Sequence, residues 1–221
     1  MRYTSLFAAS LMARRPYHRE PEAVRQHDLI MATLDCIAEF GLAGATVREV
    51  ALKAGVTPGL IRRYFHTKER MVEAAYAKLS ADMTTTINGA VGEGAASLRL
   101  ARFIRASLTA PLVDAKTLSL WAAFISSVNI DAGMAAIHRD GYRGFRKRAE
   151  SLIHDLTMER GLAPIPALVH SQSIAVNALI DGLWIEFSIS PEEFKAIDVV
   201  PFAQECAARL LGLEPNSLKD K

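Results

Sequence analysis

The feature that most constrains the fold is one segment, residues 46–66, which reads TVREVALKAGVTPGLIRRYFH. Its first four residues form a capping box, in which the Thr46 hydroxyl and the Glu49 carboxylate are each expected to satisfy a free amide of the first helical turn. Gly55 suits the left-handed position that ends a helix, and the Thr-Pro pair after it suits the start of the next one. Two short helices separated by a tight turn that contains glycine predict a helix-turn-helix.

The remaining sequence is also helical in pattern, and the two-residue alternation that marks β-strands is scarce. Before the helix-turn-helix, apolar residues recur at helical spacing over residues 21–40, and Gly41 is expected to stop that helix. After it, a long helix is expected over residues 68–88, followed by a glycine-rich linker over residues 88–97. Further helices are expected at residues 98–109, 116–129, 134–159, 166–189 and 200–213.

These patterns predict an all-α protein with two units behind a short leader. Residues 21–85 are expected to form an N-terminal headpiece, in which three helices contain the helix-turn-helix and a fourth helix connects onward. Residues 86–221 are expected to form a larger helical C-terminal unit. Residues 1–20 are expected to be a flexible leader, and the alternatives are an over-long start upstream of Met12, a signal peptide, and a basic arm that reaches DNA.

Composition and charge limit the classes of function. The cysteines, Cys36 and Cys206, form no CxxC motif or Cys/His cluster, which argues against a disulfide framework and a zinc site and favours a reducing, cytoplasmic setting. No apolar run reaches the roughly 18 residues that a membrane-spanning helix needs. Residues 1–85 carry 12 Lys/Arg against 9 Asp/Glu, whereas residues 86–221 carry 14 against 15. The basic end is therefore the one expected to meet phosphate.

The second helix of the motif divides into two faces. Helical spacing over residues 57–66 places four bulky side chains on one face, namely Leu60, Ile61, Tyr64 and Phe65. The opposite face is narrow and basic, and consists of Pro58, Gly59, Arg62, Arg63 and His66. Such a helix can approach a major groove closely, because Gly59 has no side chain to collide with bases or sugars. Arg62 and Arg63 are then expected to donate to guanine edges or phosphate oxygens.

Other residues of the motif are placed to bind the DNA backbone. Thr46 and Lys68 stand at the starts of helices, where free amides and the positive end of the helix dipole favour phosphate. The Tyr64 ring is expected to help fill the headpiece core, while its hydroxyl could still reach a phosphate. For each residue taken singly, the alternative is an ordinary solvated surface position. Taken together with the caps and the turn, these residues predict double-stranded DNA as the partner.

Over about residues 30–76 the sequence resembles the TetR family of bacterial transcriptional repressors. The resemblance rests on the segment GLAGATVREVALKAGVTPGLIRRYFHTKERMVEAAY. Thr57 and Gly59 occupy the small or polar position and the glycine position of the family pattern, and Tyr64 and Phe65 form its aromatic pair. The Lys-Glu type of helix start follows in the form Lys68-Glu69.

Carried over by position, this resemblance implies roles for individual residues. It implies phosphate contacts by Thr46, Thr57, Tyr64 and Lys68, and base contacts by Pro58, Gly59, Arg62 and Arg63. Two of these positions depart from the family pattern, since Arg62 stands where a tyrosine or a small residue is common and Arg63 stands where histidine is common. The operator sequence therefore cannot be transferred from a relative.

The C-terminal unit shows a second resemblance, to the BetI-like branch of the family, whose best-known members repress choline-to-betaine genes. It rests on LWAAFISSV at residues 120–128 and on ALIDGLWIEFSIS at residues 178–190. Aromatic faces bind quaternary ammonium ions, and a nearby carboxylate adds charge complementarity. Candidate contacts for such an effector are Trp121, Phe124, Asp181 and Trp184. The alternative is that these aromatic side chains only fill the core.

The resemblance also implies a homodimer, in which the last two long helices of each subunit form a four-helix bundle. Residues 171–189 and 200–213 match that expectation, and Gly182 would permit close helix approach. Two recognition helices held about one turn of DNA apart by two-fold symmetry favour a palindromic operator. An effector that prefers the DNA-incompetent arrangement of the headpieces then releases the repressor by linkage.

Other classes of protein are weighed against this regulator. The sequence has no GxSxG, HExxH or Walker motif, and its histidines show no metal-ligand spacing, so an enzyme, a cofactor and a metal are not expected. The enzymatic alternative is an active site hidden in the helical cavity, and a further alternative is a DNA-binding dimer without a small effector. A basic cluster is expected to be a solvated helix face, with a second anion surface as the alternative: His138, Arg139, Arg143, Arg146, Lys147 and Arg148.

Overall fold

The computed structural model describes residues 21–190, 192 and 197–219, so the expectations for residues 1–20 fall outside the described part of the chain. Within that part every regular element is a helix and no strand occurs, which confirms the all-α prediction. None of the described helices is long and apolar enough to cross a bilayer.

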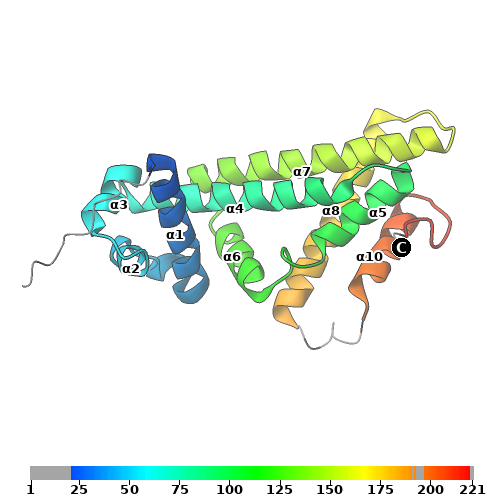
Figure 1. The fold of residues 1–221 in the computed structure, drawn as a ribbon. Coiled ribbons are helices and arrows are strands. Elements are labelled where there is room, and N and C mark those ends of the chain that lie inside the picture. Colours follow the sequence, from blue (N-terminus) through cyan, green and yellow to red (C-terminus); the bar gives the residue numbers. More distant parts are fainter. Residues whose placement is uncertain (1–20, 191, 193–196, 220–221) are drawn as a thin grey trace, which may run out of the picture.

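The N-terminal end consists of α1 (Glu22–Gly44), α2 (Val47–Lys53) and α3 (Pro58–Phe65), followed by α4 (Lys68–Val91). Figure 1 shows α1, α2 and α3 gathered at one end of an elongated molecule, from which α4 extends along its length. These helices pack around a buried headpiece cluster, which includes Leu29, Ile37, Val50, Ile61, Phe65 and Met71. The helix-turn-helix is therefore a packed unit and not an isolated hairpin of two short helices.

Local interactions explain where α2 begins and where the turn before α3 lies. The Thr46 hydroxyl accepts a hydrogen bond from the Glu49 amide at 3.2 Å, as an N-cap does. The Thr46 amide, however, donates to the Gly44 carbonyl at 2.7 Å, so a backbone bond takes the place of the bond expected from the Glu49 carboxylate. Gly55 adopts a φ of +64°, which is the left-handed conformation predicted between the two helices.

The regular part of α1 stops at Gly41, as predicted, and a short helical segment follows it. Gly41 has φ 70° and ψ 176°, which breaks the regular helical geometry, but the helix resumes and reaches Gly44. The Ala45 amide then donates to the Gly41 carbonyl at 3.1 Å. Gly41 therefore ends the regular part of α1 and kinks the chain, because glycine adopts a positive φ at little cost.

The C-terminal part contains α5 (Ala96–Ser107), α6 (Ala115–Ile125), α7 (Ala132–Glu159), α8 (Pro166–Ile189) and α10 (Val199–Leu210). Figure 1 shows α7 running along α4 for most of its length, with α8 and α10 farther from the headpiece. The predicted linker is much shorter than expected, because α4 continues past Asn88 and only residues 92–95 separate it from α5.

A second buried cluster, the C-terminal core, is built around Phe103, Ile104, Leu152 and Ile153. Helix α6 lies between the two clusters, since Leu120 and Phe124 belong to the headpiece cluster while Trp121 belongs to the C-terminal core. An ion pair also joins α6 to α1, with Lys116 Nζ 2.5 Å from Asp35 Oδ1. Helix α6 is thus in contact with the headpiece on one face and with the C-terminal core on the other.

Candidate DNA-binding and effector sites

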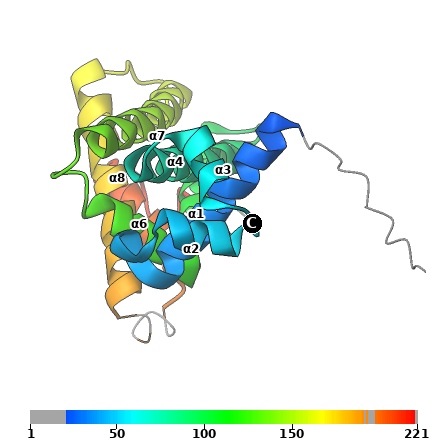
Figure 2. The same cartoon turned by 90° about the vertical axis from the view of Figure 1, so that its left-hand side faces the viewer.

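The candidate DNA-binding surface is the outer face of α3, at the end of the molecule turned toward the viewer in Figure 2. Ile61 and Phe65 are buried, and this packing turns the opposite face of α3 outward. Gly59, Arg62 and Arg63 are exposed on that face. His66, which directly follows α3, has a φ of +63° and is exposed. The structure therefore presents the two arginines and the glycine together, in front of a packed core.

Gly59 has no steric reason within the chain to be glycine. A Cβ built on it would meet only the Thr57 hydroxyl, 3.9 Å away, which is ordinary van der Waals contact. Its backbone lies in a helix, where glycine is less favourable than alanine. Nothing within the described chain therefore requires glycine at this position.

Three of the four predicted phosphate contacts lie at helix starts, namely Thr46, Thr57 and Lys68, and their polar groups differ in whether they already have a partner in the chain. Thr46 is exposed and its hydroxyl already caps α2. Thr57 is exposed and makes no side-chain cap bond, so its hydroxyl is available to a phosphate. Pro58 and Tyr64 are half-buried, and the Tyr64 ring lies beside Phe65 with centroids 6.4 Å apart. Tyr64 thus contributes to packing, as its ambiguous position in the sequence indicated.

Lys68 has a structural partner that the sequence did not reveal. Its Nζ donates to the Ala43 carbonyl at 3.0 Å and so joins the start of α4 to the end of α1. An ammonium group has three donors, so two remain for a phosphate. A single lysine can therefore hold the headpiece together and contact DNA.

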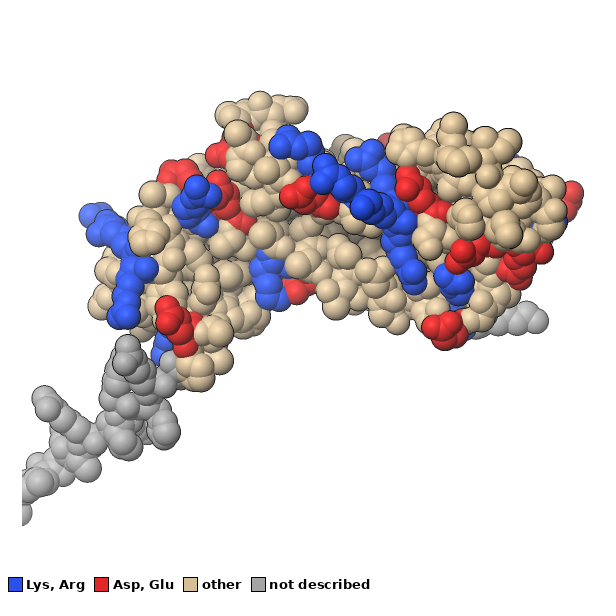
Figure 3. All heavy atoms as spheres, turned by 90° about the horizontal axis from the view of Figure 1, so that it is seen from above, with Lys and Arg blue, Asp and Glu red and all other residues tan. Residues whose placement is uncertain are grey.

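The basic cluster on α7 does not form one free surface. Arg139, Arg143 and Lys147 are exposed in a row at a spacing of four residues, and Figure 3 shows Lys and Arg gathered over this upper face with acidic side chains beside them. Arg143 pairs with Asp140 at 3.1 Å. Arg146 is half-buried, and its Nε donates to the Tyr142 carbonyl at 3.5 Å. This row is better described as a solvated helix face, as expected, than as an anion site.

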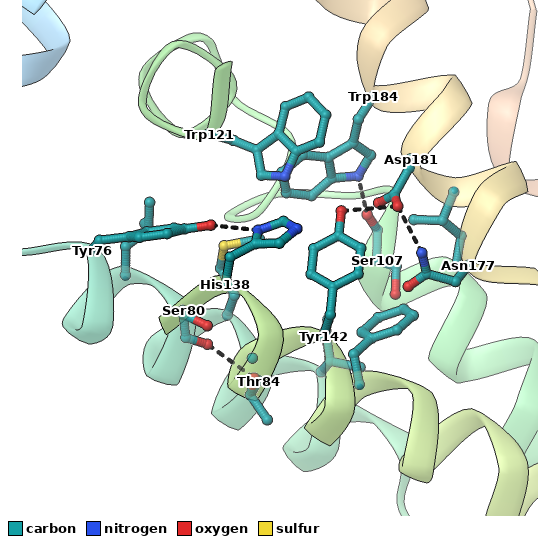
Figure 4. A pocket seen from close by; sticks show the side chains of 16 residues that line it. Tyr76, Ser80, Thr84, Ser107, Trp121, His138, Tyr142, Asn177, Asp181 and Trp184 are labelled. Atoms are coloured by element: carbon teal, nitrogen blue, oxygen red, sulfur yellow. Dashed lines mark hydrogen bonds between the residues drawn. The ribbon is translucent and has the colours of Figure 1, made fainter. Parts of the chain in front are cut away.

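A cavity of about 80 Å³ lies between α4, α6, α7 and α8. Its polar and aromatic lining residues are drawn in Figure 4 and comprise Tyr76, Ser80, Thr84, Ser107, Trp121, His138, Tyr142, Phe145, Asn177, Asp181 and Trp184. The volume is several times that needed for one water molecule. A small organic ligand can therefore be considered as its occupant.

Two indole rings form one wall of the cavity. Trp121 and Trp184 meet edge to face, with ring centroids 5.8 Å apart and planes at 68°. The Trp184 Nε1 donates to the Ser107 carbonyl at 2.8 Å, which holds the orientation of its ring. In Figure 4 the hydroxyl end of Tyr142, on α7, points toward these rings and toward Asp181.

A carboxylate stands at the edge of this aromatic wall. Asp181 Oδ2 accepts hydrogen bonds from the Tyr142 hydroxyl at 2.9 Å and from Asn177 Nδ2 at 2.6 Å. Burial raises the pKa of Asp181, although both hydrogen bonds and the charge of Arg146 act in the opposite direction. A bound cation would favour the ionised form and offset the cost of burying this charge.

A second polar pair lies at the other side of Tyr142. The Tyr76 hydroxyl and His138 Nδ1 are 2.7 Å apart, and the His138 and Tyr142 rings lie against each other with centroids 4.1 Å apart. Burial, reinforced by the positive charge of Arg146, lowers the pKa of His138. Burial also raises the pKa of Tyr76 to about 12. Both groups are therefore neutral at neutral pH.

Three of the four predicted effector contacts line the cavity together, namely Trp121, Asp181 and Trp184. Phe124 does not line it, because its side chain points into the headpiece cluster and stacks on Tyr76. The sequence interpretation missed Tyr76, His138 and Tyr142, which α4 and α7 contribute. The i, i+4 spacing of His138 and Tyr142 indicates a shared helix face, but nothing local shows that this face meets a cavity.

Comparison with known proteins identifies the class. The family described as bacterial regulatory proteins, tetR family, matches residues 29–75, and the BetI-type transcriptional repressor C-terminal family matches residues 96–212. The chain therefore belongs to the TetR family, in its BetI-type branch. It is a DNA-binding transcriptional regulator, and the predicted family is confirmed.

Individual relatives agree with this assignment. The HTH-type transcriptional regulator BetI of Escherichia coli O45:K1 (strain S88 / ExPEC) is 28% identical over 181 residues, which is 80% of this chain and 87% of the relative. A solved transcriptional regulator from Pseudomonas aeruginosa PAO1 is 29% identical with a TM-score of 0.77, and the match covers 88% of this chain and 91% of that chain. A regulator from Saccharomonospora viridis, solved in complex with choline, shares the fold with a TM-score of 0.69 at 17% identity, covering 86% of this chain and 97% of that chain.

Proposed function

We propose that this protein is a homodimeric repressor that acts in the cytoplasm, binds a palindromic operator and leaves it when a small quaternary ammonium effector binds. The observation that carries the effector part is the Trp121–Trp184 pair with the Asp181 carboxylate beside it in one cavity. In this proposal, residues 21–85 form the domain that binds DNA, and residues 86–221 form the domain that binds the effector and the second subunit.

The DNA-binding role of α3 is supported by its outward face. Arg62 and Arg63 are exposed and the α3 backbone at Gly59 is uncovered, so the helix can enter a major groove with both guanidinium groups near base edges or phosphates. Thr46, Thr57 and Lys68 lie at flanking helix starts, where they would position the helix through phosphate contacts.

The proposed dimer interface is supported by apolar side chains left uncovered on α8 and α10. Ile174, Ile185 and Ile189 of α8 are exposed, as are Phe202 and Leu210 of α10. Gly182 lies on α8 between these isoleucines, and a Cβ there would meet nothing within 4 Å. A second copy that packs closely on this face would cover the exposed apolar surface and explain the glycine.

The proposed effector class follows from the chemistry of the cavity. A quaternary ammonium ion has no N–H to donate, so it is bound through aromatic faces and opposite charge, and each close cation-π contact contributes roughly 0.5–2 kcal/mol. The two indoles supply the faces, and Asp181 supplies the charge. The Saccharomonospora viridis regulator, which shares the fold and was solved in complex with choline, supports a quaternary ammonium effector for this chain.

The operator is tested by selecting genomic fragments with the purified full-length protein and sequencing them. We expect an enriched inverted repeat whose half-sites are centred about one helical turn, roughly 34–36 Å, apart. Enrichment of a single unrepeated site would contradict the dimeric mode of binding. Neighbouring genes would also indicate which compounds the regulator senses.

The effector class is tested with the same operator by fluorescence anisotropy and by thermal shift. Choline, betaine aldehyde and simple tetraalkylammonium ions are expected to raise the melting temperature in a concentration-dependent way and to release the DNA. Asp181→Asn keeps the shape of the side chain but removes its charge, and it should bind these cations at least tenfold more weakly. Unchanged melting and unchanged DNA binding with every cation would contradict the proposal.

A further inference from the structure

We propose that His138 is a second recognition group of the effector cavity and selects a quaternary ammonium ion that carries an oxygen acceptor on a short arm. This inference rests on the proposed function, because it refines the ligand class of the same cavity. Its physical basis is the placement of His138 relative to Asp181, together with the bond that Tyr76 makes to one of its two ring nitrogens.

His138 and Asp181 lie on different sides of one ring. The Tyr142 hydroxyl bonds Asp181, whereas His138 lies against the Tyr142 ring with centroids 4.1 Å apart. A cation held near Asp181 and the indoles therefore leaves His138 for another part of the same ligand. The cavity measures about 80 Å³, and a short arm is the kind of substituent that fits beside the cation in that space.

Tyr76 determines which ring nitrogen of His138 is free. The Tyr76 hydroxyl and His138 Nδ1 lie 2.7 Å apart, and the phenol keeps its proton because burial raises the pKa of Tyr76 to about 12. In the proposed arrangement the phenol donates this hydrogen bond to Nδ1. A neutral imidazole with an accepting Nδ1 carries its proton on Nε2. The second nitrogen of His138 is then an N–H donor at the cavity, which a ligand oxygen can satisfy.

The neutral state of His138 makes it compatible with a cationic ligand. Its pKa is lowered by burial and by Arg146, so the ring adds no positive charge to the cavity at neutral pH. A lysine or arginine at the same place would donate equally well but would repel the cation. A neutral donor opposite a carboxylate thus matches a ligand with a positive nitrogen and an uncharged oxygen.

Ser80 is the competing donor, since its hydroxyl also lines the cavity. It lies across from Gly141 on the α4 wall, where a Cβ built on Gly141 would fall 2.3 Å from Ser80 Oγ. Ser80→Ala is therefore a matched control for His138→Leu, because each removes one polar group from the same cavity.

The test compares two ligands of equal heavy-atom count by calorimetry with the full-length protein. Choline carries a terminal hydroxyl where propyltrimethylammonium carries a methyl group. We expect wild-type protein and Ser80→Ala to bind choline about 3- to 10-fold more tightly, which is the range of one neutral hydrogen bond. His138→Leu should bind the two equally, with little change for propyltrimethylammonium.

The possible outcomes separate this inference from the proposed function. Equal binding of the two ligands by wild-type protein would overturn the role of His138 but leave the cation site in place. Loss of the choline preference in Ser80→Ala would show that Ser80, and not His138, donates to the ligand oxygen. Absence of binding by either ligand removes both proposals. The tautomer is checked independently by ¹⁵N NMR of wild-type protein, where a protonated Nδ1 and a bare Nε2 would contradict the argument.

Discussion

The Tyr76 ring stacks on the Phe124 ring, with centroids 4.5 Å apart and planes at 14°, while the Tyr76 hydroxyl bonds His138. One side chain therefore belongs to the headpiece cluster and lines the proposed effector cavity at the same time. A ligand that moves His138 would disturb a contact inside the DNA-binding end. This arrangement supplies a short physical connection between the two proposed sites.

We expect Phe124→Leu to weaken that connection. The substitution leaves the cavity lining intact but removes an aromatic pair worth about 0.5–1.5 kcal/mol, so effector affinity should change little while the effector-induced loss of DNA affinity becomes smaller. The ratio of operator Kd with and without saturating effector measures this coupling. Ile153→Val, a conservative change in the C-terminal core, serves as the control. A wild-type ratio in Phe124→Leu would show that the stack carries no coupling.

We expect Gly59→Ala to separate folding from DNA binding. A Cβ fits the free protein and alanine is the better helix former, so thermal stability should be equal or higher by about 0.5–1 kcal/mol. Affinity for the operator should nevertheless fall at least tenfold, because the added methyl group would meet the groove. Parallel melting and anisotropy measurements decide the point, and undiminished operator affinity would show that α3 does not approach DNA through Gly59.

We expect Arg62→Ala and Lys68→Ala to affect DNA binding in different ways. Arg62→Ala should cost about 1–3 kcal/mol on the operator and relax the preference at one base position, whereas Lys68→Ala should weaken binding to all sequences alike. Lys68→Ala should also lower stability by about 0.5–1.5 kcal/mol, because its bond to Ala43 is lost. Titrations on operator and random duplexes check this. Equal losses on both duplexes for Arg62→Ala would remove its role in reading a base.

We expect Gly182→Leu to disrupt the dimer without disturbing the subunit. A Cβ at this position meets nothing within 4 Å in the single chain, but a leucine side chain would separate two helices packed at the proposed interface. Analytical ultracentrifugation should show a shift toward monomer, with helix content preserved by circular dichroism. A fully dimeric Gly182→Leu would place the interface elsewhere.

We expect effector affinity to fall on acidification. The pKa of Asp181 is raised and that of His138 is lowered from their ordinary values. As pH falls, protonation of Asp181 removes a negative charge from the site, and protonation of His138 adds a positive one. Both changes disfavour a bound cation, so affinity is full near neutral pH and is lost as pH falls below the ordinary histidine value of about 6.5. The groups that face the pair are Tyr76 of α4, Tyr142 and Arg146 of α7, and Asn177 of α8.

Calorimetry between about pH 8 and pH 5 checks this dependence. Asp181→Asn is the matched control, because it has already lost one of the two titrating groups and should show a shallower decline. Affinity that rises on acidification would contradict the assignment of Asp181 as the group that faces the cation.

Local sequence features predicted much of the headpiece. The Thr46 cap, the left-handed Gly55 and the buried side of α3 follow from interactions between residues that are close in the chain, so periodicity and capping rules identify them. The bond from Lys68 to Ala43 was not predictable in this way, because it depends on how α4 docks against α1.

The cavity shows more clearly which features follow from local sequence and which depend on tertiary packing. The sequence by itself determined the helices, their polar and apolar faces, and the presence of Trp121, Asp181 and Trp184. Only the tertiary structure decided that Trp121 faces the cavity while Phe124, three residues later, faces the headpiece, since both lie on the apolar side of α6. It also brought Tyr76 to His138, because α4 and α7 pack closely at glycines such as Gly141, and side-chain contacts between distant helices are determined by packing rather than by local pattern.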